Sequence, residues 1–508
     1  MSRQFIWEVF VLQYTSTRNN AVNVSSARVI TDGLSSDGGL YVPTEIPSVS
    51  LRDIMRLADK SYIERAKSVL SLFLTDFTQE EIDYCVEGAY KKGKFDSIAV
   101  APVVRLTENE YVLELFKGPT CAFKDMALQL LPYFLTESAK KRQGNKEIVI
   151  LVATSGDTGK AALEGFKDVS GTKIVVFYPD MGVSNMQKLQ MATQEGSNVA
   201  VAAINGNFDD AQNGVKSIFT NEEILGKFKE NNLTFSSANS INWGRLVPQI
   251  VYYISAYCDL LKTGKIKLGE KINIVVPTGN FGNILAAYYA LRMGLPVNKL
   301  ICASNKNKVL TDFINIGSYN RNREFYTTVS PSMDILISSN LERLLYLLSG
   351  EDDEYVSGLM SLLNEKGEYT VSGTVKSKLK EFFSAGSCGE EDTFATIADC
   401  FNEYGYLSDT HTAVGINVYE QYKKETGDSC TTVIAATASP FKFPSAVLFA
   451  LTGETPRTDE FEMLAELEKI SKIAAPEQLL GLKDKPVRFD KIYDKNNMTE
   501  AIFTMLGI

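Results

Sequence analysis

Histidine is nearly absent from this chain, since His411 is the only one among 508 residues. A single histidine cannot supply a metal site that needs several imidazoles from one chain. A Ser-His-Asp hydrolase could use it, but the G-x-S-x-G sequence that presents such a serine does not occur. Catalysis must therefore rest on lysine, on carboxylates or on a cofactor.

Cysteine is scattered, odd in number and never spaced as C-x-x-C. The seven cysteines are Cys85, Cys121, Cys258, Cys302, Cys388, Cys400 and Cys430. This distribution indicates neither a disulfide framework nor a zinc site. It fits a reducing compartment best, and we expect the protein to be cytoplasmic.

Long apolar segments and basic runs are missing as well. No segment reaches membrane-spanning length, and a net charge of −10 argues against nucleic acid or an anionic membrane as a main partner. The apolar start at residues 5–12 is interrupted by Glu8 and lacks a basic leader, so we expect a strand there rather than a signal peptide. A small anionic ligand needs only a local positive pocket and stays compatible.

The remaining composition, 44% hydrophobic and 22% charged, is that of a globular protein with two or three domains. From about residue 147, helix-length segments separate short apolar runs at residues 148–153, 174–177, 199–202, 272–276, 300–302 and 432–435. This alternation predicts buried parallel strands in an open α/β architecture, with ligands bound beyond the carboxyl ends of the strands.

Three further regions are expected outside these strands. Residues 1–95 should form a helical cap, with a turn and strand at 37–41 and helices within 51–73. Residues 318–410 read as an insertion, with loops at 350–354 and 386–392 where charged and small residues gather. The tail at 459–472 has the apolar spacing of a helix.

The most informative stretch is residues 116–125, FKGPTCAFKD. Lys124 stands among apolar and small residues where a helix should begin near Asp125 and continue through Leu131. Removal from water favours the neutral amine, which condenses with an aldehyde to a Schiff base, and pyridoxal phosphate is the natural aldehyde. Alone, Lys124 reads more simply as a solvated surface lysine, so other motifs must decide.

Two segments combine a strand, a turn of small and polar residues, and a helix start: residues 153–160 (ATSGDTGK) and 277–283 (PTGNFGN). Unpaired N–H groups and the helix dipole make such turns anion sites. The first is not a P-loop, because Thr154 stands where glycine is needed and Ala161 follows Lys160. We assign a cofactor phosphate to the second. A plain helix cap and a plain glycine turn remain open readings.

Together these segments closely resemble threonine synthases of the bacterial and fungal type, which are fold type II pyridoxal-phosphate enzymes. The likeness spans most of the chain and includes residues 14–18, 37–43, 118–125, 154–159, 206–212, 239–245, 277–283 and 330–338. It implies an α/β fold like that of the tryptophan synthase β subunit, with two open, mostly parallel sheets flanked by helices. An N-terminal domain (1–95) would precede a catalytic domain (96–508) of two α/β subdomains that carries the insertion near 318–410.

The resemblance also implies the site. Lys124 would be the catalytic Schiff-base lysine, and Thr437, after the last apolar run, would face the pyridine nitrogen. The phosphate of pyridoxal 5'-phosphate would be bound by Gly279, Asn280, Phe281, Gly282 and Asn283. The substrate carboxylate would be bound by Ser155, Gly156, Asp157 and Thr158. The substrate phosphate would be bound by Asn239 and Arg245, with Arg18 or Lys160 as further candidates.

The implied reaction converts O-phospho-L-homoserine and water into L-threonine and phosphate by γ-elimination and β-addition, the last step of threonine biosynthesis, in a monomer or homodimer. Departures from the family's usual residues are Lys117 and Ser439, where histidine is usual, and Thr410, where proline is. We expect Lys117 to be solvated and His411 to be a hydrogen-bonded structural residue. The alternatives are another fold type II lyase, a hydroxyamino-acid dehydratase or phospho-lyase, and a catalytically lapsed pyridoxal-phosphate-binding protein.

Overall fold

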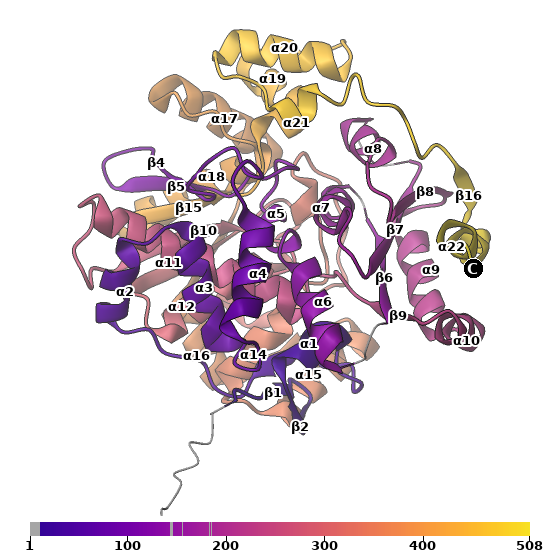
Figure 1. Ribbon diagram of the computed structural model, residues 1–508. Coiled ribbons are helices and arrows are strands. Elements are labelled where there is room, and N and C mark those ends of the chain that lie inside the picture. Colours follow the sequence, from indigo (N-terminus) through magenta and orange to yellow (C-terminus); the bar gives the residue numbers. More distant parts are fainter. Residues whose placement is uncertain (1–10, 143–145, 155, 182, 184) are drawn as a thin grey trace, which may run out of the picture.

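The computed structural model describes residues 11–142, 146–154, 156–181, 183 and 185–508 (Figure 1). Ser155 lies outside these residues, and so does most of the strand expected at 5–12. Within them, two large sheets stand side by side, and an N-terminal cap of helices covers the front of the molecule as seen in Figure 1.

The smaller of the two large sheets has five parallel strands. Their order is β16 (Ile492–Asp494), β8 (Val199–Asn205), β7 (Thr172–Pro179), β6 (Glu147–Ala153) and β9 (Leu233–Ser236). Ile148 and Ile150 of β6 enter one core together with α7 (Asp157–Phe166). Val149 enters a second core with α9 (Phe208–Thr220) and α22 (Met498–Leu506). Burial of both faces explains why these strands read as continuous apolar runs.

The larger sheet has six strands, in the order β14 (Phe383–Ser387), β11 (Val297–Ser304), β10 (Ile272–Pro277), β15 (Thr432–Ala436), β5 (Glu110–Glu114) and β4 (Val103–Arg105). Neighbours are parallel except β4 and β5, which pair antiparallel. The two sheets confirm the predicted fold class, and each apolar run listed from the sequence coincides with a strand.

The N-terminal region combines a small antiparallel sheet with helices. Strands β1 (Tyr14–Ser16), β2 (Asn19–Val24) and β3 (Tyr41–Pro43) precede the helices α2 (Leu51–Ala58), α3 (Tyr62–Phe73) and α4 (Gln79–Tyr90), with α1 (Ser26–Asp32) between β2 and β3. Capping boxes begin α2, α3 and α4. Helices α2 and α3 pack on the long helix α11 (Trp243–Lys262), which attaches the cap to the rest of the protein.

The loops predicted in the insertion are confirmed only in part, at residues 350–352 and 388–389. Residues 386 and 387 end β14, helix α17 (Glu390–Tyr404) begins three residues later, and α15 (Asp353–Lys366) begins within the other expected loop. Five of the acidic residues that suggested loops occupy the first turns of these helices, where negative charge complements the helix dipole: Asp353, Glu354, Glu390, Glu391 and Asp392. The region also contains α13 (Val309–Ile316), β12 (Ser318–Asn320), η1 (Pro331–Met333), α14 (Leu341–Ser349), β13 (Glu368–Thr370) and α16 (Gly373–Phe382).

The helix expected after Lys124 is interrupted: α5 (Asp125–Leu128) ends before α6 (Leu131–Arg142) begins. The helix predicted at 459–472 is confirmed as α20 (Glu460–Ser471), capped by Asp459. After α21 (Glu477–Leu480) the chain crosses to the smaller sheet, where it adds β16 (Figure 1). The other elements are α8 (Asn185–Ala192), α10 (Glu222–Glu230), α12 (Gly282–Met293), α18 (Thr410–Thr426), η2 (Pro440–Lys442), α19 (Pro444–Thr452) and η3 (Lys495–Asn497).

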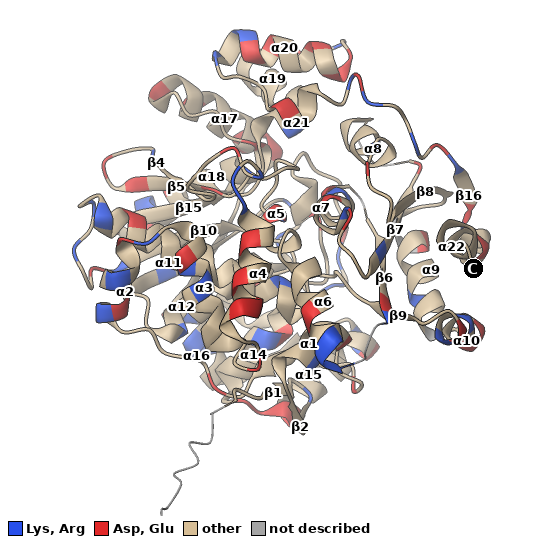
Figure 2. Cartoon of the chain, in the orientation of Figure 1, with Lys and Arg blue, Asp and Glu red and all other residues tan. Residues whose placement is uncertain are grey.

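Basic and acidic residues are interspersed along the elements in Figure 2. All seven cysteines are free, and six are buried. Among the described residues, no helix combines the length and apolar character needed to cross a lipid bilayer. The described residues also contain no cluster of histidine, cysteine and carboxylate side chains suited to a metal ion.

Candidate active site

A cavity of about 360 Å³ lies between the two large sheets, at the carboxyl ends of their strands. Its walls include the turns after β6 and β10, the residue after β15, and the start of α11. Eleven of the thirteen site residues expected from the sequence line it: Lys124, Asp157, Thr158, Asn239, Arg245, Gly279, Asn280, Phe281, Gly282, Asn283 and Thr437. Of the other two, Gly156 is not part of the lining and Ser155 lies outside the described residues.

Lys124 occupies the N-cap position of α5, and its side chain is only 10% exposed. Its Nζ lies 3.1 Å from Ser332 Oγ and 3.6 Å from Asp157 Oδ2. Burial lowers the pKa of Lys124 and outweighs the carboxylate of Asp157, which raises it, while the nearby cations Lys442 and Arg245 lower it further. These surroundings thus favour the neutral form of the amine, which is the form that acts as a nucleophile.

The other residues of the lysine motif hold the turn that carries Lys124 in shape. Asp125 is fully buried and accepts hydrogen bonds from the backbone N–H of Thr120 (2.8 Å) and from its hydroxyl (2.7 Å). A Cβ at Gly118 would lie 2.5 Å from Asp125 Oδ2, which accounts for the glycine. Burial raises the pKa of Asp125 to about 6. The motif therefore folds into a tight turn whose purpose is to present Lys124.

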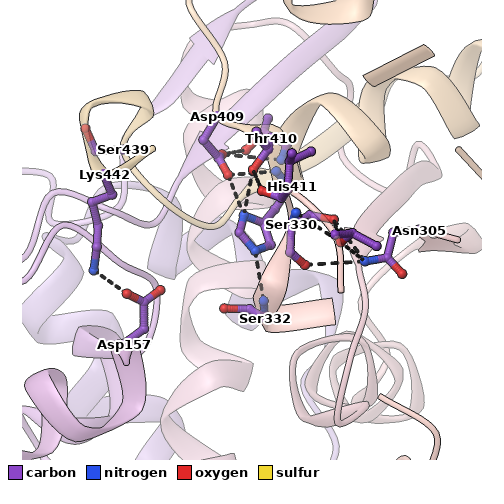
Figure 3. Close-up of polar contacts among 12 residues, drawn as sticks. Asp157, Asn305, Ser330, Ser332, Asp409, Thr410, His411, Ser439 and Lys442 are labelled. Atoms are coloured by element: carbon purple, nitrogen blue, oxygen red, sulfur yellow. Dashed lines mark hydrogen bonds and ion pairs between the residues drawn. The ribbon is translucent and has the colours of Figure 1, made fainter. Parts of the chain in front are cut away.

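Asp157, at the start of α7, carries a buried carboxylate between two ammonium groups. Lys442 Nζ lies 2.6 Å from Asp157 Oδ1, opposite the contact with Lys124, and Figure 3 shows the Lys442 side chain directed at this carboxylate. Burial alone would raise the pKa of Asp157, but Lys442 and Lys124 hold it well below its usual range. Asp157 is therefore an anion in the folded protein.

The turn after β10 presents backbone hydrogen-bond donors and no charged side chain. In the described part of the chain, the backbone N–H groups of Gly279, Asn280 and Phe281 have no protein acceptor. The carbonyls of Gly279 and Asn280 are held from outside by Ser338 (2.7 Å) and Asn340 (3.0 Å). Phe281 adopts the left-handed conformation, φ 64°, which is uncommon for a side-chain-bearing residue and frequent at functional sites.

Asn283 tests whether this turn fits a phosphate. Its Oδ1 accepts hydrogen bonds from the hydroxyls of Tyr252 (2.7 Å) and Tyr253, while its buried Nδ2 has no partner within the described residues. A Cβ at Gly279 would lie 2.5 Å from the carbonyl oxygen of Ser332, so only glycine fits there. Unpaired donors at a helix N-terminus, with an amide oriented by two tyrosines, fit a phosphate group.

Thr437 follows β15 and joins the strand to the lysine turn. Its carbonyl accepts a hydrogen bond from the N–H of Phe123 at 2.8 Å, which fixes the residue before Lys124. The side chain is 6% exposed and lines the cavity. Its hydroxyl can therefore donate to or accept from a ring nitrogen.

Arg245 is a buried cation, 6% exposed, on α11. Its Nη1 donates to the carbonyl of Ala238 at 2.8 Å, and among the described residues no carboxylate forms an ion pair with it. Burial lowers its pKa to about 10. An unpaired guanidinium in a cavity favours an anionic ligand, and the exposed Asn239 lines the same wall.

The other candidate cations are engaged elsewhere. Arg18 forms an ion pair with Glu342 at 2.7 Å, and Lys160 Nζ lies 3.2 Å from Glu164. Neither is among the described residues that line the cavity, so we do not assign a substrate phosphate to them. Lys117 lies 2.9 Å from Glu114 rather than being free in solvent.

Sequence reasoning missed Ser332 and Lys442 as members of the site. No local pattern in the sequence marks either residue, because each is brought to the site only by the fold. His411 is a hydrogen-bonded residue as expected: its Nε2 accepts from the N–H of Ser332 (3.2 Å) and its Nδ1 lies 2.9 Å from Asp409 Oδ1 (Figure 3). It also lines the cavity.

Comparison with known families gives three matches. Residues 13–90 match the threonine synthase N terminus, residues 96–438 match the family of pyridoxal-phosphate dependent enzymes, and residues 412–502 match the threonine synthase C-terminal region. These matches cover the cap, both large sheets and the tail.

Individual relatives agree. Threonine synthase of Pseudomonas aeruginosa is 39% identical over 446 residues, which are 88% of this chain and 92% of that protein. Threonine synthase-like 1 of Homo sapiens is 40% identical over 435 residues, 84% of this chain but 58% of that longer protein.

Two solved structures are similar throughout. The pyridoxal-phosphate-bound threonine synthase of Brucella melitensis superposes with a TM-score of 0.86 at 38% identity, covering 97% of this chain and 99% of that one. The yeast threonine synthase superposes with a TM-score of 0.87 at 33% identity, with the same coverage.

Proposed function

Since the chain belongs to the threonine synthase family of pyridoxal-phosphate-dependent lyases, we propose that it converts O-phospho-L-homoserine and water into L-threonine and phosphate. The observation that carries this proposal is the pairing of two anion sites in one cavity. One is the turn of unpaired donors after β10, and the other is the buried guanidinium of Arg245. A substrate with a phosphate of its own needs the second.

The cofactor is pyridoxal phosphate, which withdraws electrons from the substrate carbon next to the bound nitrogen. We propose that Lys124 bonds it and that Gly279, Asn280, Phe281, Gly282 and Asn283 hold its phosphate. The hydroxyl of Thr437 would contact the pyridine nitrogen. A neutral hydroxyl there would leave that nitrogen largely unprotonated.

The substrate contacts follow from what is left in the cavity. Arg245, with Asn239, would bind the substrate phosphate through charge-assisted hydrogen bonds. The first-turn N–H groups of Asp157 and Thr158 would receive the substrate carboxylate. Because the carboxylate of Asp157 is itself an anion, this residue can contribute its backbone but not its side chain. Gly156 lies outside the cavity lining, and its N–H already donates to Thr154 Oγ1 at 3.0 Å.

Lys124 would also carry protons. Once the substrate amine takes its place, the freed Nζ can remove a proton from Cα and return one to the substrate carbons as phosphate leaves from Cγ and water adds at Cβ. A single amine can serve as base and acid when burial brings its pKa toward neutrality. Ser332 Oγ, 3.1 Å away, can hold the freed amine in place.

We further propose that residues 1–95 and 96–508 act as a cap domain and a catalytic domain of two subdomains, with residues 318–410 as an elaboration of the second. A monomer or homodimer working in the cytosol completes the proposal, and the seven free thiols support a reducing compartment.

The test is to incubate the purified, cofactor-loaded chain with O-phospho-L-homoserine, measure phosphate release and identify the organic product. We expect threonine in a one-to-one ratio with phosphate, with turnover abolished by Lys124→Ala. Lys117→Ala is the matched control, since that lysine pairs with Glu114 outside the cavity lining and its loss should leave turnover intact. A keto acid would instead indicate a phospho-lyase, and no turnover despite bound cofactor would indicate a lapsed enzyme.

A further inference from the structure

Three charged side chains meet at the edge of the cavity: Lys124 and Asp157 line it, and Lys442 contacts Asp157. The side chains of Lys442, Asp157 and Lys124 are 1%, 5% and 10% exposed, and the carboxylate lies between the two amines. Each oxygen of Asp157 faces one of them, Oδ1 at 2.6 Å from Lys442 Nζ and Oδ2 at 3.6 Å from Lys124 Nζ. The closer partner is thus Lys442, the lysine with no part in the chemistry described above.

Lys442 is poorly placed to bind substrate or cofactor. It is not among the described residues that line the cavity. Its Nζ donates to the carbonyl of Thr120 at 3.0 Å in addition to contacting Asp157, so both contacts link parts of the protein. Thr120 belongs to the turn that presents Lys124, and Asp157 begins α7. In Figure 3 the Lys442 side chain extends from the segment after Ser439 toward Asp157.

A buried carboxylate requires a partner, because an isolated charge in a low-dielectric interior is costly. If Lys124 were the only cation near Asp157, the pair would hold the proton on Lys124 and oppose its action as a nucleophile. Lys442 removes this conflict in two ways. It supplies the charge that Asp157 needs, and its own positive charge disfavours a second cation nearby.

We propose that Lys442 is a positioning residue that balances the charge of Asp157 permanently, and thereby leaves the amine of Lys124 free to lose its proton and to bond the cofactor. This inference rests on the proposed role of Lys124 in binding the cofactor. Among the described residues, the hydroxyl of Ser332 from η1 and the ring of Phe123 also contact Lys124, and the guanidinium of Arg245 from α11 adds positive charge nearby.

The test measures the protonation of Lys124 directly. The cofactor-free full-length chain is labelled with trace acetic anhydride between pH 6 and 11, and mass spectrometry quantifies acetylation of the peptide that carries Lys124. The reaction rate follows the neutral fraction of the amine. The exposed Lys262 in the same sample is the internal reference. No substrate is needed, so failure of threonine formation would leave this measurement intact.

In Lys442→Met we expect the midpoint for Lys124 to rise by about one pH unit, which is about a tenfold lower labelling rate near neutral pH. Lys442→Arg should stay close to the parent protein, because it keeps the charge. The double variant Lys442→Met/Asp157→Asn should return to the parent midpoint or below it.

The double variant separates the proposal from simple loosening of the site. Better access of water would raise the midpoint in the single and double variants alike, whereas the proposed role predicts a rise only while Asp157 keeps its charge. An unchanged midpoint in Lys442→Met, or an equal rise in both variants, would overturn the inference.

Discussion

The turns after β6 and β10 look alike in sequence and behave differently in the folded protein. Both follow a parallel strand, contain small and polar residues and open a helix, α7 or α12. In the first, the N–H groups of Gly156 and Gly159 donate hydrogen bonds to Thr154 Oγ1, at 3.0 and 2.9 Å. In the second, the donors of residues 279–281 have no acceptor among the described residues.

The side chains deepen the contrast. The first turn carries an anionic side chain, Asp157, which lies between the ammonium groups of Lys124 and Lys442. The second brings neutral groups, including the unpaired Nδ2 of Asn283. A strand, a turn and a helix start therefore indicate that an anion could bind, but only the surrounding elements decide whether the turn presents neutral donors alone or carries an anion of its own as well. The assignment of the cofactor phosphate to the second turn depends on this difference.

The largest effect should come from closing the second turn. In Gly279→Ala the new Cβ would lie 2.5 Å from the backbone carbonyl of Ser332, and a carbonyl held in a turn cannot swing aside like a side chain. Displacing the phosphate-binding loop by a fraction of an ångström to 1 Å should lower kcat/KM by about 100-fold and weaken cofactor binding.

Cofactor content, read from visible absorbance, and steady-state kinetics check this expectation. Gly226→Ala in α10 is the matched control, because nothing lies within 4 Å of its Cβ position and its conformation is ordinary. Parent-like kinetics in Gly279→Ala would show that the loop does not carry the phosphate.

A smaller effect should follow from changing one donor into an acceptor. Asn283→Asp keeps the size of the side chain and the acceptor used by Tyr252 and Tyr253, but it replaces Nδ2 with an oxygen. Losing a charge-assisted hydrogen bond costs about 1.5–3 kcal/mol, so cofactor affinity should fall about 10- to 100-fold. Equilibrium dialysis of the cofactor would measure it.

Tyr253→Phe is the control for that variant, since it removes one support of Asn283 and leaves its amide nitrogen in place. A loss in Tyr253→Phe as large as in Asn283→Asp would assign the effect to the support rather than to the donor.

The fold was largely readable from the sequence because its strands are buried on both faces. Apolar runs such as residues 148–153 can be continuous only where neither face meets water, and each such run is a strand. The failures lie at helix starts. Glu390 and its neighbours looked like a loop because charge density was taken as a sign of solvent, whereas acidic residues also favour the first turn of a helix.

The site was readable only where its chemistry is local. Lys124 and the turn at 277–283 can be recognised in the sequence because the residues that mark them are adjacent in the chain. Lys442 and Ser332 do not. Lys442 contacts Asp157 from 285 positions away and Ser332 contacts Lys124 from 208 positions away, and only folding brings these residues together. Arg18 illustrates the converse. It belongs to a segment that resembles the family, but in the folded chain it forms an ion pair with Glu342 and is not among the described residues that line the cavity.

The smallest effect concerns Ser332, which links Lys124 to the turn after β10. Ser332 touches Lys124 through its hydroxyl and faces Gly279 through its carbonyl, and its own N–H donates to His411 Nε2 at 3.2 Å. That nitrogen must be unprotonated to accept, so the proton of the neutral ring belongs on Nδ1, beside Asp409. Because the chain has one histidine, nitrogen NMR of histidine-labelled protein should show a single ring in the Nδ1–H form.

Replacing the acceptor should then move Ser332 slightly and affect both Lys124 and the turn after β10. We expect His411→Ala to weaken cofactor binding by about fivefold, in line with about 1 kcal/mol for one lost hydrogen bond, while His411→Gln, whose carbonyl oxygen can replace Nε2, recovers part of it. An Nε2–H ring in the spectrum would contradict the arrangement, because Ser332 would then have no acceptor there and its position would have to be held by the turn alone.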